Sequence, residues 1–599
     1  MQLAQKSALV LLALAWVPDR AAGQVTVRAS VNSSGIQAND ASPYPPSISA
    51  DGRYIAFYSA ASSLVLGDNN GAPDIFVRNL RTGITTRVSV DANGQEANGI
   101  SDTATMSPDA RFVAFGSLAS NLVPGDTNGV YDIFVRDIQA GTIVRASVDS
   151  SGAELDGDSF GPSLSADGRY VAFHSRAGNL GSAPPGVYQV YVHDFQTGST
   201  VRVSEDATGV AGDGNSFDAS ISADGLSVAF TSQATNLVPG DTNGCEDVFL
   251  RTLPGATIER ISLDSTGAEG NAASGAPSLC FTFNTHRIAF QSLADNLVPG
   301  DTNGSMDIFM RELANGTTVR LSLDPLGVEG DGASLTPAFS SDGRYVAFES
   351  QATNLVPGDT NLVSDTFVRD LELSTTTRVS LATSGAQGNA QSRVAAVSAG
   401  SRLVAFVSLA TNLVTNDTND VADVFVRDFV PTEFTRLCLP GIDGVAECPC
   451  SNDPGGLDRG CENSAGTGGA SLSAFGVAYL SLDTLEFTTA GERGNALSVV
   501  LQGSAMLPNG VTYGQGVRCV GGTLKRLYTR AALSGSITVP LIVDGEIPVS
   551  VRSAELGDLI QPGQSRWYLV YYRDPVVLGG CPPSSTFNST QTGRVDWMP

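Results

Sequence analysis

Short apolar runs separated by turn residues recur along most of the chain. Within residues 104–148 four such runs occur, near 104–107, 111–117, 132–137 and 142–148. Runs of this length between turn residues are typical of strands rather than helices. The fourth run is the most polar, as expected for a strand at the outer edge of a sheet. The pattern predicts a sheet of four antiparallel strands.

This unit repeats. A motif of the form Ser-x-Asp-Gly-Arg-Tyr-x-Ala-Phe ends, with variations, at Phe57, Phe115, Phe173, Phe230, Phe290, Phe348 and Phe406. A second motif, Asp-Ile-Phe-Val-Arg-Asp, follows each copy and begins at Asp74, Asp132, Asp247, Asp307, Asp365 and Asp423, with Gln189 in the divergent third copy. Tandem four-stranded units of this kind form the blades of a β-propeller, and seven copies predict seven blades.

Extra strand patterns flank the seven units. The pattern of the fourth strand occurs at Arg28, before the first full unit, and again near Arg436. We expect Val25 to Val31 to pair into the last blade, which would join the two ends of the ring and remove a free sheet edge. The copy at Arg436 either extends that blade or leads into the next domain.

Two connections in each unit are long. They join the second strand to the third, and the fourth strand to the first strand of the next unit. In a four-stranded meander both lie on the same side of the sheet, which we call the looped face. Long loops on a rigid scaffold commonly carry function, so the looped face is the predicted binding surface.

The segments "SADGRYVAF" and "DIFVRD" resemble the TolB-like, or WD40-like (PD40), propeller repeat of exported bacterial proteins. The resemblance covers about residues 25 to 437 and implies an exported propeller. That family is often six-bladed and has a shorter repeat. The count of seven blades therefore comes from this sequence and not from the resemblance.

The chain divides into three parts on this basis. Residues 1–23 have the apolar run and small-residue end of a signal peptide, residues 24–437 form the propeller, and residues 438–599 form a small β-sandwich. The predicted fold class is all-β. Six cysteines of the third part are disulfide candidates: Cys438, Cys448, Cys450, Cys461, Cys519 and Cys581. A zinc site is the alternative, although the cysteine spacing does not match a zinc ribbon.

Net charge limits the partners. The formal charge of -26 argues against nucleic acid and anionic membranes, which both require a positive surface. No segment after the predicted signal peptide has the roughly 20 apolar residues of a membrane-spanning helix. We expect a monomer exported to the periplasm, the cell surface or the medium, with a protein or glycan at the cell surface as its partner.

An acidic loop recurs in six of the seven units. Its Asp-x-Asn-Gly sequence and a following Asp could offer oxygen ligands to calcium, but the same sequence is equally typical of a hydrogen-bonded turn. No cofactor is required by the sequence. The calcium candidates are Asp68, Asn70, Asp74, Asp126, Asn128, Asp132, Asp241, Asn243, Asp247, Asp301, Asn303, Asp307, Asp359, Asn361, Asp365, Asp417, Asn419 and Asp423.

Catalytic motifs are scarce. Ser159 lies in a Gly-x-Ser-x-Gly match, but no helix is expected after it, as a nucleophile elbow requires. The three histidines occupy unrelated positions, which disfavours a His-dependent triad. The sequence therefore favours a non-catalytic binding or scaffolding protein. The alternatives are a hydrolase or lyase that uses carboxylates at the propeller channel on a polysaccharide, with Glu154 and Asp213 as candidates, and a calcium-stiffened structural surface protein.

Overall fold

The computed structural model describes residues 26–597, except 254–256, 282–285, 399–402, 430–434, 438–439, 441–444, 450–451, 455–458, 476–477, 480–481, 484, 542–545, 562 and 577–585. The predicted signal peptide, residues 1–23, lies outside the described residues. In the described part, no helix is long and apolar enough to cross a membrane.

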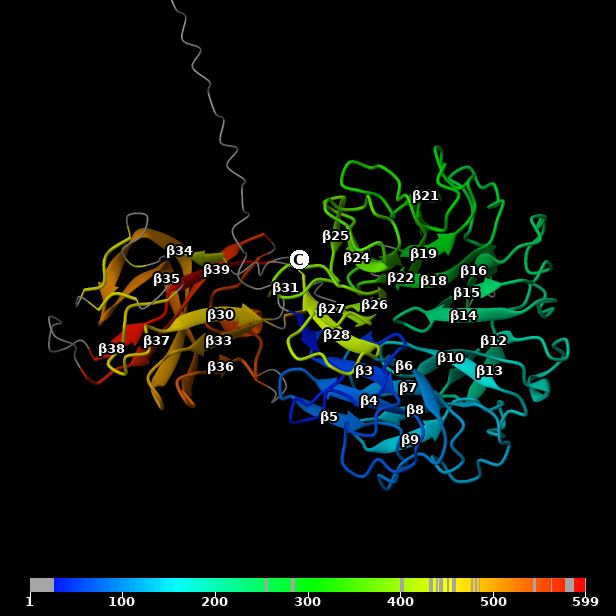
Figure 1. The fold of residues 1–599 in the computed structure, drawn as a ribbon, viewed down its shortest axis with the longest axis horizontal. Coiled ribbons are helices and arrows are strands. Elements are labelled where there is room, and N and C mark those ends of the chain that lie inside the picture. The colour runs from blue at the N-terminus through cyan, green and yellow to red at the C-terminus, as the bar shows by residue number, and fades with distance from the viewer. Residues whose placement is uncertain are drawn as a thin grey trace, which may run out of the picture.

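Seven four-stranded antiparallel sheets form a ring (Figure 1). The first strand of each sheet contacts the first strand of the next, and the seventh returns to the first through β26 and β2. The predicted seven-bladed propeller is confirmed. The strands of blades 1 to 3 are β2 Ser47–Ile48, β3 Tyr54–Ser59, β4 Asp74–Asn79, β5 Ile84–Arg87; β6 Ser101–Met106, β7 Phe112–Ser117, β8 Asp132–Asp137, β9 Thr142–Arg145; β10 Ser159–Leu164, β11 Tyr170–Ser175, β12 Gln189–Asp194 and β13 Ser199–Arg202.

The remaining blades repeat this plan. A short 3-10 helix, η1 Gly178–Leu180, lies between β11 and β12. The strands of blades 4 to 7 are β14 Ser216–Ile221, β15 Ser227–Ser232, β16 Asp247–Thr252, β17 Thr257–Arg260; β18 Ser274–Phe281, β19 His286–Ser292, β20 Asp307–Glu312, β21 Thr317–Arg320; β22 Ser334–Phe339, β23 Tyr345–Ser350, β24 Asp365–Asp370, β25 Thr375–Arg378; β26 Ser392–Val397, β27 Leu403–Ser408, β28 Asp423–Asp428 and β1 Thr26–Arg28.

The repeated apolar residues form the core between blades. Each blade pairs an aromatic ring of its second strand with one of its third, as Phe57 and Phe76 do at 5.8 Å between ring centroids. Each of seven buried clusters joins two neighbouring blades; Phe115 and Phe134 of blade 2, for example, pack with Ile75 of blade 1. The middle strands are therefore apolar on both faces, which explains their nearly continuous apolar runs.

Strand β1 closes the ring as predicted. Thr26, Val27 and Arg28 pair antiparallel with Arg427, Val426 and Phe425 of β28, so β1 is the outer strand of blade 7. The second extra strand, β29 Thr435–Leu437, pairs instead with β39 Thr592–Asp596 of the C-terminal domain. The sequence at Arg436 thus leads into the next domain.

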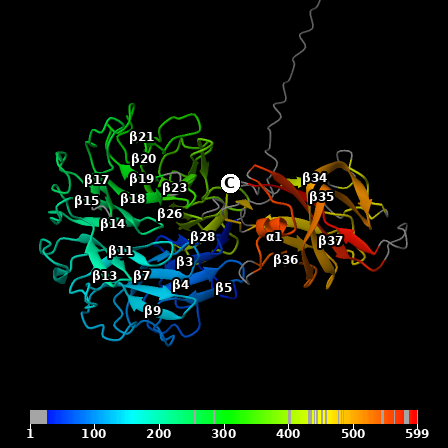
Figure 2. The same ribbon diagram turned by 180° about the vertical axis from the view of Figure 1, so that it is seen from behind.

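The C-terminal domain is a β-sandwich (Figure 2). One sheet has the order β29-β39-β37-β34-β35, with β38 beside β37, and the other has the order β30-β33-β36. The ring centroids of Phe487 and Tyr568, one from each sheet, lie 4.5 Å apart in the shared core. Its further elements are β30 Ser471–Phe475, β31 Ala478–Tyr479, β32 Leu482–Asp483, β33 Glu486–Ala490, β34 Leu497–Tyr513, β35 Gly516–Ala531, β36 Thr538–Val539, α1 Val549–Glu555, β37 Ser565–Arg573 and β38 Phe587–Ser589.

Disulfides brace this domain. Cys448 is bonded to Cys461, and Cys519 is also disulfide-bonded. Cys438, Cys450 and Cys581 lie outside the described residues. In the propeller, Cys245 and Cys280 are free thiols.

The two domains meet at blade 1. Arg53 and Arg81 both pair with Glu486, which is only 2% exposed. In blade 2 the arginine equivalent to Arg53 is Arg111, which pairs within its own blade with Asp137 at 2.8 Å. Blade 1 has Asn79 at the position of that aspartate. Arg53 therefore has no carboxylate partner at this position of its blade and pairs across the domain boundary.

Candidate functional site

The acidic loops that recur in six blades each surround an arginine. In blade 2, Arg145 of strand β9 lies 3.4 Å from Asp126, 3.2 Å from Asp132 and 2.9 Å from Glu154. Asp126 and Glu154 come from the two long connections, so both connections lie on the same face, as expected. We call this group the loop cluster: two aspartates, an asparagine, the arginine of the fourth strand, and the Glu or Gln of the following loop.

Further hydrogen bonds tie the loop cluster together and to its neighbours, although a few buried atoms, such as Arg145 Nε, have no hydrogen-bond partner among the described residues. The Asn128 amide donates to Asp132 and to the carbonyl of Leu155, both at 2.9 Å, and Ser147 donates to the other oxygen of Asp132. The same Asn to Asp bond, 2.8 to 3.1 Å long, occurs in six blades. The fourth-strand arginines of these six blades are Arg87, Arg145, Arg260, Arg320, Arg378 and Arg28.

Blade 3 lacks the loop cluster and connects its loops by other residues. Gln189 stands where the other blades have the second Asp, and Ala211 stands where blade 2 has Glu154. The Gln189 side chain accepts a hydrogen bond from Ser204 at 2.7 Å and donates to the carbonyl of Gly212 at 3.0 Å. One neutral amide therefore supplies the bonds that an Asp and an Asn supply elsewhere. This substitution indicates that the loop cluster holds the two loops together.

Burial and crowding raise the pKa of the first aspartate. The pKa of Asp126 rises to about 6, because the carboxyl is desolvated and lies beside Asp132, although Arg145 acts in the opposite direction. The pKa of Asp301 rises to about 6, also chiefly through desolvation. Hydrogen bonds from Thr127 lower the pKa of Glu154.

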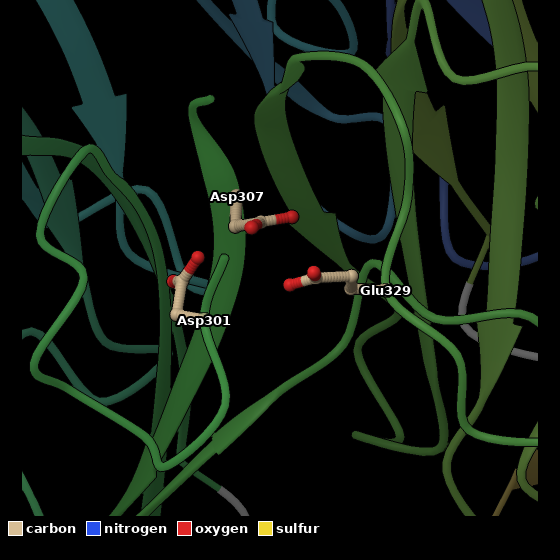
Figure 3. Close-up of side chains that lie close together, drawn as sticks. All are labelled: Asp301, Asp307 and Glu329. Atoms are coloured by element: carbon tan, nitrogen blue, oxygen red, sulfur yellow. The ribbon is translucent and has the colours of Figure 1, made fainter. Parts of the chain in front are cut away.

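Blade 5 has the donor set most suited to a metal ion. Asp301, Asp307 and Glu329 face one another, with ligand oxygens within 4.8 Å of each other (Figure 3). Arg320 pairs with all three, at 3.6 Å from Asp301 and 3.1 Å from Asp307, and forms a shorter bond to Glu329. A calcium ion would have to displace this guanidinium. In blade 5, Arg320 is therefore an internal partner for the carboxylates of Asp301 and Asp307, which the sequence offered to calcium.

Three other sequence candidates have structural partners. Ser159 is fully buried in strand β10 and donates to Ser175 at 3.1 Å. Glu154 belongs to the loop cluster, and its position is Glu in blades 1, 2, 4 and 5, so it is not specific to one blade. Asp213 accepts from Thr235 at 2.7 Å, as Asp331 accepts from Thr353 in blade 6. None of these residues is set apart from its repeat equivalents.

Blade-specific residues lie instead at the inner rim of the looped face. In six blades a serine that begins the first strand bonds a serine that ends the second, as Ser101 and Ser117 do at 3.0 Å. The next pair inward differs from blade to blade. These pairs are Asp102 and Gly116, Phe160 and His174, Phe217 and Thr231, Gly275 and Gln291, Leu335 and Glu349, and Arg393 and Val407.

The backbone bulges directly after this pair. In blades 2 to 6 the third residue of the first strand has a positive φ, between 47° and 60°. Two of the five are threonines, Thr103 and Thr336, and β-branched residues rarely adopt this conformation. Bulges of this kind redirect side chains and are frequent beside functional sites.

Aromatic side chains gather at the rim of blades 1 to 3. The rings of Tyr44 and Tyr58 meet edge to face at 4.6 Å, and the rings of Tyr131 and Phe160 lie 5.0 Å apart. Tyr188 contacts Phe160 at 6.2 Å. Tyr44 is 44% exposed, and the other four are half-buried. We call Tyr44, Tyr58, Asp102, Tyr131, Phe160, His174 and Tyr188 the rim site.

Two rim carboxylates differ from those of the loop clusters. Desolvation raises the pKa of Asp102, and within the described residues its one hydrogen-bond donor is Thr103, at 2.9 Å. Desolvation and the charge of Glu246 raise the pKa of Asp218, although that side chain is exposed to solvent. No ion pair with an arginine or lysine is formed by either carboxylate in the described part of the chain.

The sequence interpretation missed the rim site because it compared what the repeats share. The signal was present in the residues that break the repeat: Tyr131 and Tyr188 precede the third strand where other blades have Pro73 or Glu246. Assigning these residues to one surface required the register between the first and second strands.

Comparison with known proteins gives distant structural likenesses. No protein-family model and no curated protein matches the chain. An oligogalacturonate lyase in complex with manganese is 11% identical, covering 68% of this chain and 97% of its own, with a TM-score of 0.42. A putative TolB from Agrobacterium tumefaciens is 16% identical, covering 46% of this chain and 79% of its own, with a TM-score of 0.30. A chain of the mitotic checkpoint complex is 12% identical, covering 71% and 99%, with a TM-score of 0.35.

Proposed function

We propose that this chain is an exported, non-catalytic binding protein that holds a protein ligand on the looped face of its propeller, at the rim site. The observation that carries the proposal is the gathering of repeat-breaking aromatic residues at one end of blades 1 to 3. Exposed aromatic side chains grouped on a rigid surface are typical of binding hot spots. The sequence resemblance to the TolB-like and WD40-like repeat of exported proteins supports export.

The rest of the looped face supports this location. The carboxylates of the loop clusters lie beside an arginine of their own blade, so the clusters stiffen the loops and leave few charges free to bind a partner. The rim site has the opposite character, since its rings are partly exposed and Asp102 has no cationic partner among the described residues. Binding energy is commonly concentrated in such a subset of a surface.

The test is binding by the full mature chain. Proteins and glycans recovered on the wild-type protein are purified, and their affinities are compared for wild type, Tyr188→Ser and Ile138→Ser. Ile138 is the matched control, because it is 40% exposed beyond the end of β8, away from the looped face. We expect Tyr188→Ser to weaken the ligand by about tenfold or more and Ile138→Ser to leave it unchanged. Equal affinity of all three proteins would contradict the proposal.

A carboxylate-dependent hydrolase or lyase is the second candidate. It is favoured by the raised pKa values of Asp102 and Asp218, because unpaired carboxyls of this kind are frequent at active sites. Turnover of a polysaccharide by the wild-type chain, lost in both Asp102→Asn and Asp218→Asn, would establish this activity. Absence of turnover across acidic and neutral polysaccharides would leave the binding function.

A further inference from the structure

Three tyrosines and one carboxylate meet at the rim of blades 1 and 2. We propose that Tyr44, Tyr58, Tyr131 and Asp102 bind an organic cation, the ammonium or guanidinium group of a Lys or Arg side chain on the protein ligand. This inference rests on the proposed function and names the chemistry that the rim site recognises.

The tyrosines supply the aromatic part of the site. Tyr44 and Tyr58 meet edge to face, with their planes at 87°, and such an arrangement presents the face of one ring beside the edge of the other. Tyr131 directly precedes β8, whose first residue pairs with Ser117. The electron-rich face of a tyrosine attracts a cation, and groups of such rings recognise ammonium groups.

Asp102 supplies the charge. It faces Gly116 in the register of β6 and β7, and no side chain projects from that position. The ideal position of a Cβ at Gly116 is 2.8 Å from the Asp102 carboxylate, so any larger residue would crowd the carboxylate. The Asp102 carboxylate therefore occupies the space that a side chain at position 116 would take, and among the described residues it receives one hydroxyl hydrogen bond.

The contrast with the loop clusters indicates what is missing at Asp102. The desolvated second aspartates Asp74 and Asp132 lie 3.1 Å and 3.2 Å from an arginine of their own blade. Asp102 is desolvated too, and no described cation pairs with it. A cation from a ligand would supply the attraction that offsets desolvation elsewhere in the same protein.

The surroundings are acidic. Burial raises the pKa of Tyr58 to about 12, and the neighbouring Tyr44, Asp102 and Asp40 add to the shift. Asp158 lies close enough to contribute to the raised pKa of Tyr131, and it pairs with Arg176. The chain carries a net charge of -26, so its field favours the approach of a basic ligand.

The experiment measures binding of immobilised short peptides to the full mature chain. The probes are a lysine peptide, an arginine peptide and an N-acetyl-lysine peptide of equal length. We expect the lysine and arginine peptides to bind and the acetylated peptide to bind at least tenfold more weakly, because acetylation removes the charge. Comparison of the lysine and arginine peptides shows which cation the site prefers.

Two variants locate the cation. Asp102→Asn preserves an oxygen for the Thr103 bond and removes the charge, and Tyr44→Leu removes an exposed ring; each should weaken the basic peptides about tenfold. Asp295→Asn is the charge-matched control on the looped face of blade 5 and should leave affinity unchanged. Melting temperatures of all variants confirm that they are folded.

Three outcomes would overturn the inference: no binding of the basic peptides, equal binding of the acetylated peptide, or equal weakening by Asp295→Asn. The last would indicate nonspecific attraction to an acidic surface. If the ligand recovered on the wild-type protein is a glycan or a neutral peptide that still depends on Tyr188, the cation inference fails and the rim binding function stands. If a recovered ligand is insensitive to Tyr188→Ser, the proposed function itself fails.

Discussion

A single arginine per blade balances the acidic loops of this propeller. Arg320 is only 5% exposed and contacts carboxylates from both long connections of the looped face. Removing one partner from a buried ion pair leaves an unpaired buried charge, which destabilises the fold more than replacing both partners with apolar residues does. We therefore propose that the loop clusters are structural elements in which the arginine neutralises the carboxylates that the sequence offered to calcium.

Replacing that arginine tests this account. We expect Arg320→Met to lower the free energy of unfolding by about 3 kcal/mol and Arg202→Met in blade 3 to lower it less, because Arg202 faces one carboxylate, Glu205. Calcium should leave the melting temperature of wild type unchanged and raise that of Arg320→Met, whose three carboxylates then lack a cation. A melting temperature of wild type that rises with calcium would contradict the structural role of Arg320.

The raised pKa of Asp301 predicts a pH dependence. Since its folded pKa of about 6 lies above its value in an unfolded chain, the folded state binds the proton more tightly, and this carboxyl destabilises the fold as pH rises from about 4 to about 6. His174 acts oppositely, because burial lowers its pKa to about 4. The quantity to measure is therefore the difference in stability between wild type and Asp301→Asn at each pH.

We expect wild type to become progressively less stable than Asp301→Asn as the pH rises from about 4 to about 7. Asp149→Asn serves as the control, since hydrogen bonds from Ser151 lower the pKa of Asp149, so above about pH 5 it is mostly ionised in both states. Parallel melting curves for wild type and Asp301→Asn across the range would show that Asp301 has an ordinary pKa in the folded protein.

At the scale of strands, the sequence predicted most of the propeller. Blade number, strand order and closure by the N-terminal strand follow from the seven copies and the strand pattern at Arg28, because each blade forms from local contacts and its neighbours. The rim site did not follow. Tyr44, Tyr58 and Asp102 come from three elements, and only the closed ring and the bulged first strands bring them together.

Strand β1 provides a test at this scale. A chain that begins at Ala29 lacks the outer strand of blade 7 and leaves Asp417 and Asp423 without Arg28, which lies 3.2 Å and 3.5 Å from them. We expect it to be less stable than a chain beginning at Thr26 by about 3 kcal/mol or more, measured by denaturant unfolding. Equal stability of the two chains would show that β1 does not secure the ring.

At the scale of the whole molecule, one buried ion-pair group joins the two domains. Asn79→Asp gives Arg53 the in-blade partner that Arg111 has in blade 2, and an aspartate can still accept the two backbone bonds that Asn79 accepts from Arg81 and Thr82. Arg53 would then be shared between Glu486 and the new aspartate at position 79. We expect the two domains of Asn79→Asp to unfold in more widely separated calorimetric transitions than those of wild type.

Thr252→Asp is the matched control, because Thr252 pairs with Ser227 in blade 4 as Asn79 pairs with Tyr54 in blade 1. The residue before Ser227 is Leu226, whereas the residue before Tyr54 is Arg53, so the new aspartate has no arginine at this position. It adds the same charge to blade 4 and should leave the separation of the transitions unchanged. Identical calorimetric profiles for wild type and Asn79→Asp would show that Arg53 and Glu486 do not couple the domains.

We propose that the rim site of the looped face binds the ligand, and hydrogen exchange can locate the bound ligand on the protein. Exchange of the full mature chain is measured with and without saturating ligand recovered on the wild-type protein. The account predicts slower exchange in the segments around Tyr44, Asp102, Tyr131 and Tyr188, with no change in the turns at the opposite ends of the same blades. Protection confined to those opposite turns, or to the C-terminal domain, would contradict it.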